Sequence, residues 1–103
     1  MSELFYGSKY ENGEIIVRQG TKEELEKEGL KVYNTEWMAK KKAEIRKHFA
    51  YRKILLGMTM EELKSPQALE MAKFNIKVRK LSVSPEDYIQ GIIDFIEKEK
   101  DPQ

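Results

Sequence analysis

The sequence predicts an α+β fold in which a small N-terminal β-hairpin and strand element packs on a predominantly three-helix body. Three observations indicate this class. A β-branched run follows an Asn-Gly pair, apolar residues recur at helical spacing after residue 34, and capping residues divide that region into helices. With 103 residues the chain has the size of one ordinary domain. We therefore expect a single domain, with a ββαβ-like element over 1–33 and a helical part over 34–100.

The N-terminal hairpin is predicted from its turn. Asn12 and Gly13 both tolerate positive φ, which is what a tight two-residue hairpin turn requires. The apolar run 4–6 precedes this turn, and the β-branched segment 14–18 follows it as the second strand.

A short helix and a third strand are expected to complete this element. Thr21 and Glu24 have the spacing of a capping box, in which hydroxyl and carboxylate each satisfy a backbone donor. The helix should run over about 22–28 and end at Gly29. The alternating segment 30–33 then predicts a third strand.

A long central helix is predicted over 35–56, and Gly57 is its stop signal. Four large apolar residues fall within about 40° of one another on a helical wheel. We expect this stripe to be buried, and it consists of Met38, Ile45, Phe49 and Leu56. A second face carries the small residues Ala39, Ala43 and Ala50, where another backbone could approach closely.

Capping signals divide the remainder into a short helical turn and two helices. Thr59 and Glu62 predict a capping box, and Ser65-Pro66 begins a helix that reaches about Leu81. An alternative interpretation makes 75–83 a strand, because its apolar residues also alternate. Ser84-Pro85 begins the last helix, and residues 101–103 form a tail.

The helix that begins at Ser65 is apolar on two sides, which indicates a central position or a shared partner surface. One stripe, expected in the core, consists of Met71, Phe74, Val78 and Leu81. The second patch is a candidate interaction surface and consists of Leu69, Ala72 and Ile76. Gly91 interrupts the last, strongly amphipathic helix, where it could allow a neighbouring helix or partner to pack closely.

Composition excludes several kinds of chemistry. The chain has no cysteine and one histidine, so thiol catalysis, disulfides and the common zinc motifs are excluded. His48 is expected to be a structural residue at a helix boundary. No nucleophile–base pair, metal cage or glycine-rich phosphate loop is visible. We therefore expect no enzyme activity, no cofactor and no metal.

The sequence shows no signal peptide and no apolar run long enough to span a membrane, so we expect a soluble cytoplasmic protein.

Charge is segregated along the chain although the overall net charge is only +1. Residues 37–80 carry a net +8, flanked by −3 before them and −4 after them. Within 40–53, seven basic residues are interleaved with aromatics, which is typical of phosphate-backbone contacts. The candidate partner-binding or nucleic-acid-binding residues are Lys40, Lys41, Lys42, Arg46, Lys47, Tyr51, Arg52 and Lys53.

The sequence is compatible with two functions. The first is a small non-catalytic interaction protein, such as an adaptor, inhibitor or assembly subunit, whose surplus apolar surface is covered by another protein or by self-association. The second is a nucleic-acid-binding protein that contacts phosphates through 40–53, largely independently of sequence. The basic residues point in several directions around the helix, which favours the first function.

Overall fold

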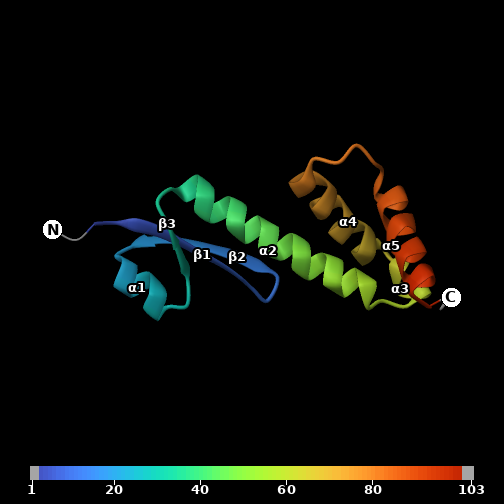
Figure 1. Cartoon of the computed structure of the whole chain (residues 1–103), viewed down its shortest axis with the longest axis horizontal. Coiled ribbons are helices and arrows are strands. Elements are labelled where there is room, and N and C mark those ends of the chain that lie inside the picture. The colour runs from blue at the N-terminus through green and yellow to red at the C-terminus, as the bar shows by residue number, and fades with distance from the viewer. Residues whose placement is uncertain (1–2, 101–103) are drawn as a thin grey trace. The chain divides into compact units, whose positions relative to one another are not determined.

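The computed structural model describes residues 3–100, which form three strands and five helices and confirm the α+β class (Figure 1). The predicted tail, 101–103, lies outside the described residues. In chain order the elements are β1 (Phe5–Glu11), β2 (Glu14–Gly20), α1 (Lys22–Lys27), β3 (Lys31–Tyr33), α2 (Glu36–Leu56), α3 (Met60–Leu63), α4 (Pro66–Arg79) and α5 (Pro85–Lys100). The chain divides within α2 into two compact units, residues 1–47 and 48–103.

The first unit is built on a three-stranded antiparallel sheet in the order β2-β1-β3. The predicted hairpin turn is confirmed, because Asn12 and Gly13 take φ angles of 51° and 85°. Glu11 pairs with Glu14 across this turn, which fixes the register of β1 against β2.

Both faces of this sheet are covered within the first unit. Gly7 lies on one face, where a Cβ would meet Leu25 of α1 and Leu30. The next residue, Ser8, points to the opposite face because side chains alternate along a strand, and it is also fully buried. Tyr33 shares that second face and accepts a hydrogen bond from Arg46 of α2. Arg46 of α2 therefore contacts the face that α1 leaves open.

The capping box predicted for α1 is only half present. The Glu24 backbone N–H donates to the Thr21 hydroxyl, at 3.3 Å, as predicted. The Glu24 carboxylate accepts instead from that hydroxyl, at 3.0 Å, and so does not satisfy a backbone donor. The helix still ends as expected, since Gly29 takes a φ of 82°.

The predicted buried stripe of α2 was wrong. Met38, Ile45 and Phe49 are 39%, 37% and 56% exposed, and Leu56 is only partly buried. The buried residues of α2 are Ala39 and Ala43 in the first unit and His48 and Leu55 in the second. In the first unit, the face of α2 with the alanines is therefore covered, and the face with Met38 and Ile45 is exposed.

The second unit is a helical assembly around one apolar core. Its buried members are Leu55, Leu63, Ala68, Ala72, Ile89 and Ile92. The predicted caps are confirmed: Thr59 and Glu62 form a complete capping box on α3, and Ser65 and Ser84 accept backbone hydrogen bonds at the starts of α4 and α5.

The end of α4 excludes the strand alternative for 75–83 and shortens the predicted helix. Lys80 takes a left-handed conformation with a φ of 54°, and the Leu81 N–H donates to the Ile76 carbonyl at 3.0 Å. Leu81 therefore leaves the helical stripe and is 43% exposed, which contradicts its predicted place in the core. Met71, Phe74 and Val78 are partly buried, and the fully buried positions of α4 are Ala68, Ala72 and Asn75.

Candidate functional site

A cavity of about 240 Å³ in the second unit is the best candidate site, because it joins basic, aromatic and buried polar side chains. Its walls come from α2, from the end of α4 and the residues after it, and from α5. The lining residues are His48, Phe49, Arg52, Arg79, Leu81 and Tyr88.

His48 forms the buried part of this cavity wall and is only 5% exposed. It lies in the middle of α2, so the prediction of a helix-boundary histidine was wrong. Its Nδ1 atom is buried without a hydrogen-bond partner, and its ring meets that of Phe49 edge-on, with the ring centroids 5.1 Å apart. Burial, and then the charges of Arg79 and Arg52, lower the pKa of His48 below 6.5. The imidazole is therefore neutral at pH 7.

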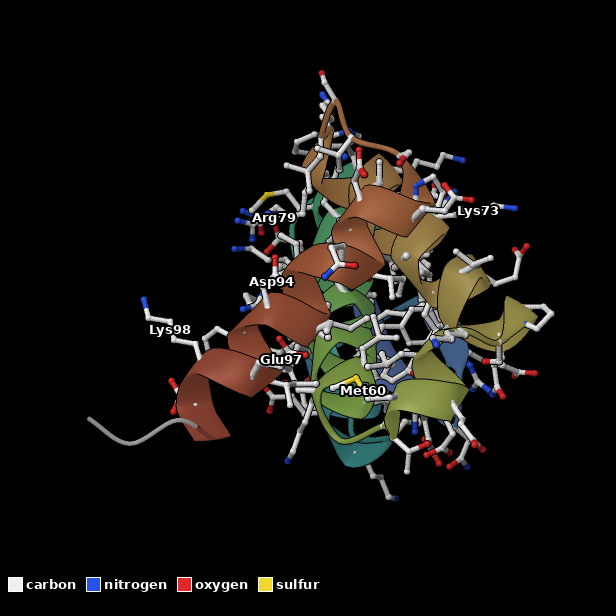
Figure 2. All side chains as sticks on the ribbon, turned by 90° about the vertical axis from the view of Figure 1, so that its right-hand side faces the viewer. Met60, Lys73, Arg79, Asp94, Glu97 and Lys98 are labelled. Atoms are coloured by element: carbon white, nitrogen blue, oxygen red, sulfur yellow. The ribbon has the colours of Figure 1, made fainter. Side chains whose placement is uncertain are left out.

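The two arginines give the cavity a positive charge that no carboxylate of its lining balances. Within the described part of the chain, neither Arg52 nor Arg79 has a carboxylate within salt-bridge distance. The Arg52 guanidinium lies 5.8 Å from the ring centroid of Phe95, which holds it by a cation–π contact. Arg79 is exposed at the last position of α4. In Figure 2 it lies on the opposite side of this unit from Lys73.

Tyr88 connects the cavity to the core. Its phenol oxygen accepts a hydrogen bond from the Asn75 side-chain nitrogen at 3.0 Å, and Asn75 is fully buried. Since that oxygen already accepts from Asn75, its own O–H hydrogen is available to donate to another group.

The predicted basic segment does not form one surface, because several of its members have partners within the protein. Lys40 forms an ion pair with Glu36 at 3.4 Å, and Arg46 donates to Tyr33. The Lys41 ammonium lies 6.0 Å from the ring centroid of Trp37. Lys42 and Lys53 are exposed, whereas Lys47 and Tyr51 are half-buried. Of the predicted residues, only Arg52 lines the candidate cavity.

The predicted interaction surface on α4 is partly occupied by the protein itself. Ala72 is fully buried in the core, so it is not accessible to a partner, and Ile76 is half-buried. Leu69 lines an apolar groove of about 290 Å³ together with residues of α3 and α5. Gly91 is exposed, and a Cβ there would meet no described atom within 4 Å, so close packing within the chain does not require this glycine.

A third cavity, of about 320 Å³, lies in the first unit, but its charges are compensated. The Arg18 guanidinium donates to both carboxylate oxygens of Glu28 at 3.0 Å. Lys9 forms an ion pair with Glu11 at 2.7 Å. This cavity therefore offers less unbalanced charge to a ligand than the one around His48.

The sequence predicts only a structural role for His48, and Arg79 lies outside the predicted basic segment 40–53. One signal was present: His48, Phe49 and Arg52 occupy positions i, i+1 and i+4 of a helix, which places the first and last on one face. No sequence pattern showed that the end of α4 and Tyr88 would close the other walls.

Two further features bear on the class of site. Across residues 3–100, no group of three or more histidine, aspartate or glutamate residues could hold a metal ion. None of the helices in that range is long and apolar enough to cross a bilayer.

Comparisons with protein-family models, with curated proteins and with solved structures found no match to this chain.

Proposed function

We propose that this chain is a small, non-catalytic binding protein that receives an acidic segment of another protein at the cavity around His48. The observation that carries this proposal is the pair of arginines without carboxylate partners, bordered by exposed apolar side chains. Phe49, Leu81 and Phe95 are 56%, 43% and 43% exposed. Arginine and aromatic residues dominate the binding energy of protein interfaces, since they combine large contact area with directed hydrogen bonds.

Charge supports an acidic partner. Arg52 and Arg79 lack carboxylates within salt-bridge distance in the described residues, and the cavity lining contains none. A partner carboxylate would gain charge-assisted hydrogen bonds without displacing an existing ion pair. An aromatic or aliphatic side chain next to that carboxylate could pack on Phe49 and Leu81.

A binding role also fits the side chains that line the cavity. Its lining includes no carboxylate and no serine or threonine hydroxyl, and its one imidazole is buried. These groups suit recognition better than acid–base or nucleophilic chemistry. The proposal includes a cytoplasmic location, because the sequence contains no cysteine.

The test is selection of binders from a random peptide library displayed on phage. We expect enriched peptides to combine acidic and aromatic residues, and to lose at least tenfold in affinity against Arg79→Gln and Phe49→Ala. Lys73→Gln is the matched control, because Lys73 is an exposed cation on α4 that forms an ion pair with Glu70. Peptides that bind all variants equally would overturn the proposal. Sedimentation over a range of concentrations tests whether a second copy of the chain occupies the surface instead.

A second candidate, single-stranded nucleic-acid binding, rests on one observation in the first unit. Trp37 is 68% exposed with the Lys41 ammonium 6.0 Å from its ring centroid, an arrangement that suits stacking of a base beside a phosphate. Fluorescence anisotropy with labelled RNA and DNA at about 50 and 200 mM salt tests it. We expect binding to weaken at the higher salt and to be lost in Trp37→Ala and Lys41→Glu. Equal binding by these variants would exclude the candidate.

A further inference from the structure

We propose that the cavity around His48 is a phosphate-binding site in which Arg52 and Arg79 hold a phosphate monoester group. This proposal rests on the proposed function and names the group that the site recognises. It is carried by the placement of two guanidinium groups beside one buried imidazole, in a cavity whose lining has no carboxylate.

The positive charge of the cavity favours binding of an anion. Two permanent positive charges line a space that is partly shielded from water, and both act on His48, whose pKa is lowered by burial and then by these charges. Like charges in such a place repel one another unless a counter-charge lies between them. The two positive charges match a phosphate monoester, which carries close to two negative charges at pH 7.

The donors available in the cavity suit the oxygens of a phosphate group. The Arg52 guanidinium carries five N–H donors, and its cation–π contact with Phe95 occupies no hydrogen-bond acceptor, so donors remain available for a ligand. Arg79 adds a second set of such donors, and Tyr88 adds the O–H hydrogen that its bond from Asn75 leaves unused.

The number of donors favours phosphate over carboxylate. One guanidinium already satisfies a carboxylate with two parallel hydrogen bonds, whereas the three terminal oxygens of a phosphate monoester can accept from several donors at once. The cavity volume, about 240 Å³, lies below the roughly 300–1,000 Å³ typical of pockets for drug-sized ligands. It therefore suits one anionic group and the first atoms of its carrier.

The carrier that agrees with the proposed function is a phosphorylated side chain of the partner protein. Phe49 and Leu81 line the same cavity and are exposed, so they can contact the residues on either side of the phosphate. A free nucleotide has the same phosphate chemistry and is the other source that the experiment must separate.

The experiment is an NMR titration of the full chain with inorganic phosphate at pH 7 and constant ionic strength. The Arg52 and Arg79 Nε–H signals and the His48 ring signals are followed. We expect saturable shifts at millimolar phosphate, and at least tenfold weaker binding in Arg52→Gln and in Arg79→Gln. Lys73→Gln, the control with an exposed lysine in an ion pair, should bind as the wild type does. Bound phosphate should also raise the pKa of His48, because it offsets the two arginine charges.

Two comparisons complete the test. Acetate should bind at least tenfold more weakly than phosphate. A phosphoserine peptide with flanking apolar residues should bind more tightly than adenosine monophosphate, and the reverse order would assign the site to a nucleotide instead. Shifts that do not saturate, or that persist unchanged in both arginine variants, would overturn the phosphate site. If that happened while unphosphorylated library peptides still required Arg79, the proposed function would stand and only the phosphate inference would fail.

Discussion

Asn75 of α4 donates a hydrogen bond from its side-chain nitrogen to the phenol oxygen of Tyr88 in α5, at 3.0 Å. Asn75 is fully buried, and Tyr88 lines the candidate cavity. The bond therefore joins the two helices through a partly buried polar contact, and it holds one wall of the cavity. The Asn75 side-chain oxygen is buried without a partner, so this amide depends on Tyr88 for its one hydrogen bond within the described residues.

Tyr88→Phe should lower the free energy of unfolding by about 1–3 kcal/mol, because it leaves the buried Asn75 amide without its partner. In an Asn75→Leu background the same change should cost much less, since no polar group is then left unsatisfied. Urea unfolding followed by circular dichroism measures both. Equal losses in the two backgrounds would show that the hydrogen bond does not contribute to stability.

The free energy of unfolding should fall as the pH drops below about 6.5, because the pKa of His48 is lowered in the folded state. The unfolded chain takes up this proton at a higher pH than the folded chain, so protonation favours unfolding. The charged or titratable groups that face His48 are Arg52 on its own helix, Arg79 on α4 and Tyr88 on α5.

His48→Gln, which stays neutral, should flatten this pH dependence between about pH 6.5 and 5. The measurement is urea unfolding at several pH values. Glu62 does not interfere, because backbone and side-chain hydrogen bonds with Thr59 hold its pKa below 4.5 and its contribution is lost only at lower pH. An unchanged slope in the variant would contradict the prediction.

Gly7→Ala should destabilise the first unit by about 1–3 kcal/mol. The added Cβ would lie 3.0 Å from the side chains of both Leu25 and Leu30, which are buried and have little room to move. Gly20→Ala is the matched control, since its Cβ would lie 3.4 Å from the flexible Glu24 carboxylate and should change stability by less than about 0.5 kcal/mol. Thermal unfolding by circular dichroism compares the two, and similar midpoints would contradict the packing argument.

Gly91→Ala should stabilise the protein by about 0.5–1 kcal/mol, because the position is helical and exposed, and a Cβ there meets no described atom within 4 Å. Gly29→Ala should have the opposite effect, since Gly29 has a φ of 82° that disfavours a side chain. Urea midpoints of the two variants should therefore move in opposite directions. A stabilised Gly91→Ala protein that binds selected peptides more weakly would place Gly91 in the partner surface.

Elements with local signals were predictable from the sequence. The Asn12-Gly13 turn and the caps at Thr59, Ser65 and Ser84 depend on atoms within a few residues. Both can therefore be predicted from neighbouring residues in the sequence. The half-formed box at Thr21 shows the limit, because the same spacing allowed its carboxylate another hydrogen bond.

Burial was harder to predict, because it depends on which segment covers a helix. A helical wheel of α2 has both a stripe of large apolar residues and a face of alanines. Hydrophobicity alone predicts that the stripe of large residues is buried, whereas the buried face is the one with Ala39 and Ala43. Nothing in the sequence shows that Ala39 and Ala43, rather than Met38 and Ile45, are the covered residues of α2 in the first unit. The candidate cavity has the same difficulty, since His48, Arg79 and Tyr88 come from three separate helices or their ends.

The exposure of Trp37 affects how this protein can be studied by optical methods. Trp37 is the only tryptophan in the sequence, it belongs to the first unit, and 68% of its surface is in contact with solvent. Its emission should already resemble that of a solvated indole in the native state, so denaturation will shift the spectrum very little. In thermal unfolding followed by tryptophan fluorescence, the signal change would therefore be small, and it would not report on the helices around the cavity. For those helices, far-ultraviolet ellipticity is the suitable reporter.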